Sequence, residues 1–344
     1  MDSPKLPTRK LGKNGPEVTA LGFGAMGLSA YYGPPKPDEE RLAMLDHVYA
    51  SGERFWDSAD IYLDNEDLLG KWFKANPGKR ETIFLATKFA NYVDPVTKQR
   101  KVRNDPEYMK ACIEKSLKRL GVDHVDLYYA HRIQADQPIE VTIKAMKELQ
   151  DAGKIRHIGL SECSADTLRR ASKVAHIAAI QVEYSPCALE IEDPQFDVLK
   201  AARETGTAIV AYSPLGRGFF TGSIKSRDDF EEGDFRLFAP RFSEENFASN
   251  LKLVDEFVAL AKEKGVTPGQ LVLAWLMAQG DDIIPIPGTT RIKNFDENMG
   301  ALKVNVTKED NDRIRKAISK VEIKGGRYPE AFASALYVST VPLK

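Results

Sequence analysis

Cysteine is scarce in this chain of 344 residues, since only Cys112, Cys163 and Cys187 are present and they are far apart. Their odd number and wide spacing exclude a disulfide framework and a Cys-x-x-Cys metal site. A surplus of positive charge is also absent, because 49 lysines and arginines face 50 aspartates and glutamates. This balance argues against a general nucleic-acid-binding protein, which usually carries a basic surplus.

Long apolar runs are absent as well. The longest ones are short, such as LVLAWLMA at 271–278, whereas a helix that spans a bilayer needs about 20 residues. The first residues, MDSPKLPTRKLGKNG, lack the apolar segment of a secretory signal. We therefore expect a protein without membrane contact in the reducing environment of the cytoplasm.

Two families of hydrolase motifs are missing. The five histidines contain no His-x-His and no His-Glu-x-x-His, which disfavours a metal-dependent barrel hydrolase. No Gly-x-Ser-x-Gly sequence is present to form the nucleophile turn of a serine hydrolase. We expect no bound metal.

Two short sequences imitate nucleotide-enzyme motifs. GFGAMG at 22–27 fits G-x-G-x-x-G, but that motif requires a helix to begin at once under the pyrophosphate. The following LSAYYGPPKP cannot form this helix, and the next helix is expected near Asp38. Tyr32 and Lys36 imitate the Tyr/Lys pair of short-chain dehydrogenases, yet the prolines between them forbid the helix that would bring the pair together.

Strand-like and helix-like segments alternate along the whole chain. Near-continuous apolar runs typical of buried parallel strands cover 19–24, 54–57, 82–88, 125–131, 155–161, 178–184, 207–213 and 282–288. Helices are expected over 38–51, 65–75, 106–120, 138–152, 164–175, 194–204, 268–279 and 307–319, several with a cap residue before them and glycine after them. Eight such units predict a single-domain (β/α)₈ TIM barrel over 1–344; an open doubly wound sheet is the competing arrangement.

Three segments fall outside the repeating unit. A turn signal within 9–20 predicts a hairpin that plugs the bottom of the barrel. The stretches 214–250 and 321–344 are long for barrel connections, and long irregular segments in compact folds are commonly functional lids. Active sites of such barrels lie at the carboxyl ends of the strands, so long loops are expected there.

Polar residues gather at the carboxyl ends of the predicted strands. Asp57, Lys88 and His131 end three of them, and Tyr62 follows just beyond the first. A tyrosine has a reference pKa of about 10 and needs help to act as an acid. Lys88, held charged by Asp57, could stabilise its phenolate, while His131 could orient a carbonyl oxygen. This set suits protonation of an oxygen while a redox cofactor supplies hydride.

Several independent segments, in order, resemble the aldo-keto reductases. They are WDSADIYLDNE (56–66), LATKF (85–89), DLYYAH (126–131), GLSE (159–162), IQVEYSP (180–186), AYSPLGRGFFTG (211–222), GDFR…PRFS (233–243) and IPIPGTTRIKNFDEN (284–298). The glycine-rich segment together with 233–243 resembles the fungal, plant and bacterial branch that reduces aldehydes and ketones. The resemblance implies a (β/α)₈ barrel, NADPH/NADP⁺ without metal, a small-molecule aldehyde or ketone substrate, and a catalytic tetrad.

The resemblance also implies roles for individual residues. The tetrad falls on Asp57, Tyr62, Lys88 and His131, with Tyr62 as proton donor. Cofactor contacts fall on Ser161, Glu162, Gln181, Tyr212, Ser213, Pro214, Leu215, Gly216, Gly218, Gly288, Thr289, Thr290, Arg291, Glu297 and Asn298. The segment 214–250 would cover the cofactor, and 321–344 would lie near the substrate pocket.

Two positions depart from the family pattern. Glu162 stands where many members have asparagine, although it could still accept a hydrogen bond from the carboxamide. Gly288 stands where well-studied members have a lysine that binds the 2′-phosphate. Arg291 and Lys293 would then bind this phosphate instead. A non-catalytic or weakly catalytic nucleotide-binding, redox-sensing subunit on the same barrel is the alternative function.

Pocket walls are expected from the loops after the strands. Substrate contacts are expected from His131, Met26, Tyr32 and Tyr92. Further aromatic candidates, for which ordinary packing is an equal explanation, are Tyr31, Tyr184, Phe219, Tyr328 and Phe332.

Overall fold

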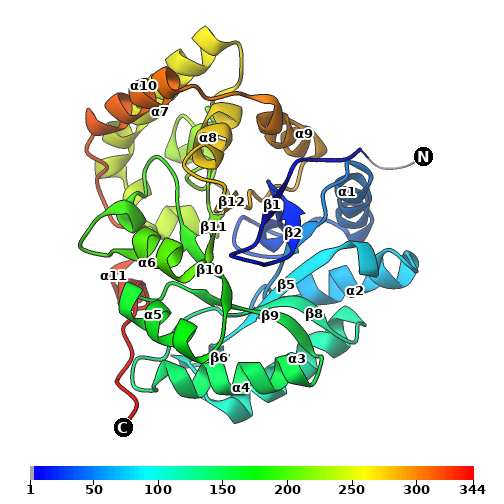
Figure 1. Ribbon diagram of the computed structural model, residues 1–344. Helices are drawn as coiled ribbons and strands as arrows, with labels where there is room; N and C mark the ends of the chain where they lie inside the picture. Colours follow the sequence, from blue (N-terminus) through cyan, green and yellow to red (C-terminus); the bar gives the residue numbers. More distant parts are fainter. Residues whose placement is uncertain (1–3) are drawn as a thin grey trace.

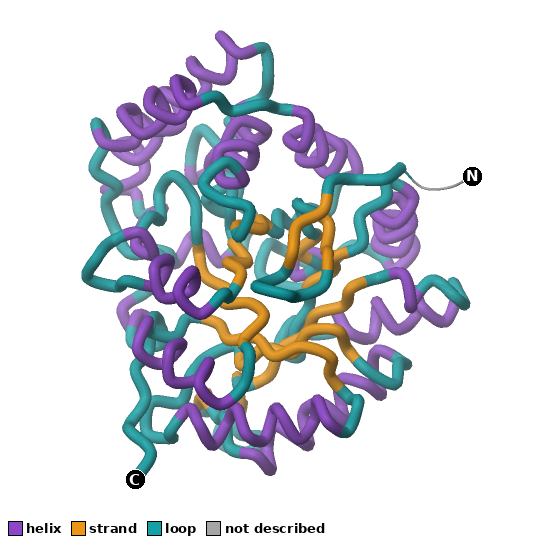
Figure 2. The backbone as a smooth tube through the Cα atoms, viewed as in Figure 1, coloured by secondary structure: helices purple, strands orange, loops and turns teal. Residues whose placement is uncertain are grey.

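Eight parallel strands form one curled sheet that is surrounded by helices in the computed structural model, which describes residues 4–344 (Figures 1 and 2). The first three residues, which the predicted domain includes, lie outside the described part. In spatial order the strands are β12 (Ile283–Pro285), β11 (Ala208–Tyr212), β10 (Ile177–Glu183), β9 (Ile155–Ser161), β8 (Val125–Ala130), β5 (Phe84–Phe89), β4 (Phe55–Asp57) and β3 (Phe23–Gly24). Every residue of β8 and β10 is buried, as expected for strands covered on both faces. The predicted single-domain barrel is confirmed.

Backbone hydrogen bonds join the first barrel strand to the last and close the ring. Gly22 N donates to Pro285 O at 2.9 Å, and Gly24 N donates to Pro287 O at 3.2 Å. The chains approach so closely that a Cβ atom on Gly24 would lie 2.8 Å from Ile286 O. These glycines therefore serve barrel closure, and the helix required for a dinucleotide turn does not follow them.

The outer helices match most of the predicted ranges. They are α1 (Asp38–Ala50), α2 (Asn65–Ala75), α3 (Pro106–Leu120), α4 (Ile139–Asp151), α5 (Ala165–Val174), α6 (Val198–Thr205), α7 (Glu244–Lys264), α8 (Pro268–Met277), α9 (Ile292–Gly300), α10 (Lys308–Ser319) and α11 (Glu330–Ala333). The Asp105 side chain caps α3, and Gly121 ends it at a φ of 65°.

Four elements were not predicted: α7, α9, α11 and a hairpin formed by β6 (Asn91–Val93) and β7 (Arg100–Val102). Among the predicted helices, α6 begins only at Val198 instead of 194, and α8 ends at Met277 instead of 279. The long segment 214–250 contains short 3₁₀ turns before α7 begins at Glu244.

The predicted N-terminal hairpin is present as β1 (Thr8–Lys10) and β2 (Glu17–Thr19), and it lies across the centre of the ring in Figure 1. Arg9 donates to Ile283 O at 2.6 Å, and Lys13 N donates to Gly206 O at 2.6 Å. Both acceptors lie at the amino ends of barrel strands. The hairpin therefore covers the face opposite to the strand ends that carry the candidate site.

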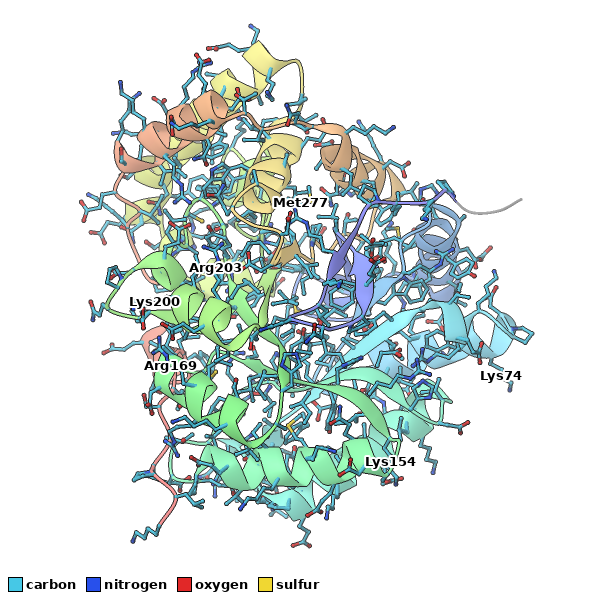
Figure 3. The ribbon with its side chains drawn as sticks, in the orientation of Figure 1. Lys74, Lys154, Arg169, Lys200, Arg203 and Met277 are labelled. Atoms are coloured by element: carbon cyan, nitrogen blue, oxygen red, sulfur yellow. The ribbon has the colours of Figure 1, made fainter. Side chains whose placement is uncertain are left out.

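Charged side chains cover the outside of the ring. Lys74 at the end of α2 and Lys200 on α6 are exposed and point away from the barrel in Figure 3. Within residues 4–344, no helix combines the length and apolar character needed to cross a membrane.

Candidate active site

A cavity of about 1610 Å³ opens at the carboxyl ends of the barrel strands. Sites for a single small ligand commonly measure about 300–1,000 Å³, so this cavity has room for two ligands. The loops after the strands form its walls, together with parts of 214–250 and of 321–344. Three residues of the predicted tetrad, Asp57, Tyr62 and His131, line the cavity, and the fourth, Lys88, is buried against Asp57.

Asp57 and Lys88 form a buried ion pair at the ends of β4 and β5. Lys88 Nζ contacts Asp57 Oδ1 directly and donates to Ser58 O at 2.7 Å. Gln181 Nε2 donates to the other Asp57 oxygen at 2.8 Å. Burial raises the pKa of Asp57 and lowers the pKa of Lys88, and the charge of each partner opposes both shifts. The pair therefore has no net charge toward the cavity.

Tyr62 lies in a turn directly after β4, with 8% of its surface exposed. Lys88 Nζ is 5.1 Å from its ring centroid. Burial, reinforced by Asp57, raises the pKa of Tyr62 well above 10, whereas Arg132 acts to lower it. The phenol is therefore neutral and carries its proton at physiological pH.

His131 follows β8 and meets Tyr62 edge to face, with 5.8 Å between the ring centroids. Burial, together with the positive charge of Arg132 and Lys88, lowers the pKa of His131 well below 6.5. Asn91 Nδ2 lies 3.1 Å from His131 Nδ1. An amide nitrogen can only donate, so Nδ1 is the acceptor and the ring proton resides on Nε2.

Arg132 was not singled out from the sequence. It lines the cavity beside His131, donates to the His131 carbonyl oxygen at 2.7 Å, and lies near the Tyr328 hydroxyl. Its only sequence signal is its place directly after a strand-end histidine, a position at which solvent-exposed arginines are equally common.

Most of the residues predicted to contact a cofactor line the same cavity. Those that do are Ser161, Gln181, Tyr212, Ser213, Pro214, Leu215, Gly218, Gly288, Thr289, Thr290, Arg291 and Asn298. Glu162, Gly216 and Glu297 do not line it. Glu297 accepts from Thr267 Oγ1 at 2.8 Å, which turns its carboxylate toward α8.

Glu162 has other partners than the predicted one. It is fully buried, pairs with Arg327 at 3.1 Å and accepts from the Tyr212 hydroxyl at 2.8 Å. The Tyr212 ring, which lines the cavity, is therefore anchored at its hydroxyl end by the residue that follows β9. Contact between Glu162 and a cofactor stays a prediction.

The predicted substrate-side residues Met26, Tyr32, Tyr92 and His131 all line the cavity. Three further aromatic candidates, Tyr31, Tyr328 and Phe332, line it as well. Tyr184 and Phe219 do not. Tyr184 contacts Glu192 through its hydroxyl on the outer side of the barrel, and Phe219 packs against Phe242 and Phe247.

The amino end of α9 faces the cavity without a cap. No side chain caps its first amides, and no acidic residue lies in its first turn. Thr289, Arg291 and Asn294 line the cavity there. Exposed amides and the helix dipole favour an anion at such a place, and Arg291 adds a positive charge.

A buried ionic cluster joins 214–250 to the tail. Glu183, at the end of β10, pairs with Arg217 at 3.1 Å, Arg241 at 3.5 Å and Arg327 at 3.7 Å. Although burial raises the pKa of Glu183, the arginines hold it below its usual value. Both segments that wall the cavity are therefore fixed to the ends of β9 and β10 through one set of charges, which the sequence analysis did not identify.

The chain is similar to known proteins over nearly its whole length. Residues 20–319 match the Aldo/keto reductase family. A protein of Schizosaccharomyces pombe named Aldo-keto reductase yakc, with the designation NADP(+), is 51% identical over 340 residues, which cover 98% of this chain and 99% of that protein. Aldo-keto reductase str7 of Strobilurus tenacellus is 49% identical over 327 residues, which cover 94% and 95%.

A solved structure supports the fold alone. The glycerol dehydrogenase of Gluconobacter oxydans superposes with a TM-score of 0.81 at 23% sequence identity, covering 93% of this chain and 97% of that one.

Proposed function

The chain belongs to the aldo/keto reductase family, and on that premise we propose that it reduces aldehydes or ketones to alcohols with NADPH as reductant and Tyr62 as proton donor. The observation that supports this most is the convergence of Tyr62 and His131 at the cavity floor above the Asp57–Lys88 pair. A neutral phenol and a neutral imidazole with its proton on Nε2 are both hydrogen-bond donors. Two such donors are what the protonation of a carbonyl oxygen requires.

The residues of the cavity fit NADPH. Ser161 Oγ is buried without a hydrogen-bond partner and lines the cavity, so it is available to a nicotinamide carboxamide. Tyr212 offers a ring fixed at its hydroxyl end for stacking. The uncapped amino end of α9, with Arg291, suits a 2′-phosphate. The remaining length of the dinucleotide would lie along Ser213–Gly218.

The chain's own groups account for the proton. When bound, NADPH supplies a hydride to the carbonyl carbon. Tyr62 gives its proton to the carbonyl oxygen, and His131 donates a second hydrogen bond from Nε2 to the same oxygen. Lys88 lies close enough to stabilise the phenolate that remains on Tyr62, and solvent returns the proton afterwards.

Two segments complete the site in this proposal. Residues 214–250 cover the cofactor, because Gly218 and Leu215 lie at the cavity wall next to the predicted stacking residue. The tail 321–344 walls the substrate side through Tyr328 and Phe332.

Replacing Tyr62 by phenylalanine tests the proposal. The substitution removes only the donated proton, so carbonyl reduction should fall by about 10²–10⁴-fold, while the dissociation constant for NADPH stays unchanged. Turnover is followed by the loss of reduced-nicotinamide absorbance over a panel of aldehydes and ketones, and binding by fluorescence titration. Near-normal turnover by Tyr62→Phe would rule out this tyrosine as the acid. Tight NADPH binding by the unsubstituted protein without turnover of any carbonyl would favour the redox-sensing alternative.

A further inference from the structure

Arg132 is a cation without an anionic partner in the cavity wall. Among residues 4–344, no aspartate or glutamate side chain forms an ion pair with its guanidinium. This distinguishes it from Arg217 and Arg236 in the same cavity, which pair with Glu183 and Asp234. Arg132 is half-buried. Removing a charge from water without pairing it is unfavourable, so a half-buried guanidinium without an ion-pair partner suggests a ligand.

Most of the hydrogen-bonding capacity of Arg132 is unused. One N–H donates to His131 O at 2.7 Å, and a second approaches the Tyr328 hydroxyl at 3.5 Å. A guanidinium has five donors in a planar fork, and no described residue accepts from the others. The backbone contact fixes the side chain beside His131, while the free donors remain available to a ligand in the cavity.

The surrounding wall is positive. We define the substrate side as the cavity lining contributed by 91–102, by 131–132 and by 328–336. Its charged lining residues are Arg100, Lys101 and Arg132, and these three segments contribute no aspartate or glutamate to the lining. Asp57 on the floor is neutralised by Lys88. The potential on this side therefore favours an anion.

Aromatic rings form part of the uncharged lining of the substrate side. Tyr92 lies on β6, while Tyr328 and Phe332 come from the tail. Such rings offer flat apolar faces that suit an aromatic or otherwise planar substrate body.

We propose that Arg132 is a specificity-determining residue that selects carbonyl substrates bearing a carboxylate on a planar, preferably aromatic, body. Its planar fork can bind a carboxylate through two parallel hydrogen bonds. His131 and Arg132 are consecutive and both line the cavity, so one ligand can present its carbonyl to the first and its carboxylate to the second. This inference rests on the proposed function and names its substrate class.

Matched substrate pairs test the inference. The three isomers of carboxybenzaldehyde are compared with their methyl esters, which keep the aromatic aldehyde but remove the negative charge. The unsubstituted protein should prefer at least one acid over its ester by roughly 10–100-fold in kcat/KM, mainly through KM, as expected for charge-assisted hydrogen bonds. Arg132→Gln should abolish this preference, and Arg132→Lys should keep part of it. The control is Arg103→Gln, which removes a nearby charge that is paired with Asp105 outside the cavity, and it should preserve the preference.

A binding measurement separates this inference from the proposed function. Calorimetry on the full chain, with and without NADP⁺, compares the hydroxymethylbenzoate isomers with their methyl esters. At least one acid should bind roughly tenfold or more tightly, and Arg132→Gln should lose that difference. Equal binding of acids and esters, or a preference that survives in Arg132→Gln, overturns the inference even if neutral aldehydes are reduced. A carboxylate preference in binding without any turnover would support the anion site and reject the proposed function.

Discussion

Asn91 determines which nitrogen of His131 carries the proton. Its amide donates to Nδ1, which leaves the Nε2 proton free for a ligand in the cavity. Burial and two nearby cations keep the same ring uncharged. A neutral histidine is a weaker acid than an imidazolium and does not compete with Tyr62 as proton donor. In the proposed reaction Tyr62 therefore gives the proton, and His131 only donates a hydrogen bond.

Replacing Asn91 by aspartate should turn this arrangement into a pH-sensitive one. A carboxylate next to His131 favours the imidazolium and raises its pKa from well below 6.5. The unsubstituted protein should show no titration of His131 near neutral pH in kcat/KM, whereas Asn91→Asp should gain a limb there, and kcat should fall while cofactor affinity is kept. The pH profile together with histidine NMR measures this. A profile that overlays the unsubstituted one would mean that Asn91 does not control the ring.

Single residues differ in how well the sequence predicts them. The tetrad could be found because Asp57, Lys88 and His131 each end an apolar strand, where a polar residue stands out in the sequence. Asn91 and Arg132 could not, because their importance depends on contacts across the cavity floor and on the absence of a partner. Glu162 was noticed as unusual, but its bonds to Tyr212 and Arg327 arise from segments distant in the chain.

Among the helices, α9 has no side-chain cap at its amino end, the same end that is proposed to bind the 2′-phosphate of NADPH. Helix starts are predicted from cap residues, and this one has no side-chain cap, which explains why α9 was not predicted. The helix α7 was missed for another reason, since 214–250 was interpreted as one long irregular segment although regular helix begins within it at Glu244. Of these two helices only α9 lies at the wall of the cavity, where ligand contact weakens local signals.

The amino end of α9 should discriminate between the two nicotinamide cofactors. Arg291→Ala should weaken NADPH binding by roughly 10–100-fold, because a charge-assisted bond contributes about 1.5–3 kcal/mol. NADH lacks the 2′-phosphate, so its dissociation constant should not change. Fluorescence titration of both cofactors measures this. Lys293, the second residue predicted for the phosphate, does not line the cavity, so Lys293→Ala should leave both dissociation constants unchanged. An equal loss for both cofactors would place the effect on the shared adenosine instead.

The ionic cluster should control the position of the tail. Arg327→Met removes the cation between Glu162 and Glu183 and leaves buried carboxylates undercompensated. Breaking such a pair typically costs about 3–5 kcal/mol, so the free energy of unfolding should fall and residues 321–344 should be cleaved faster in limited proteolysis. Lys308→Met, which breaks an exposed pair on α10, should leave both unchanged. An unaltered cleavage rate in Arg327→Met would show that other contacts hold the tail.

The whole molecule depends on a seam between segments more than 200 residues apart in the sequence. Periodicity predicted the eight strands, because each strand and helix carries its own local pattern. It did not show how the ring closes, since closure depends on contact between Gly24 and Gly288. The departure of Gly288 from the family's lysine has a physical reason, because a Cβ atom there would lie 2.7 Å from Gly24 O.

Because the barrel closes through a close contact at Gly288, a single methyl group added there should lower the stability of the whole barrel. Gly288→Ala must push the two segments apart, and overpacking of this kind costs about 1–3 kcal/mol, so thermal unfolding should occur at a lower temperature. Gly269→Ala is the matched control, because its Cβ would meet nothing closer than 3.5 Å and it lies within α8, where alanine is favoured over glycine. Its unfolding temperature should stay the same or rise. If both variants unfold at the same temperature as the unsubstituted protein, the two segments can move apart without a loss of stability. Lack of space would then not explain why position 288 has glycine instead of the family's lysine.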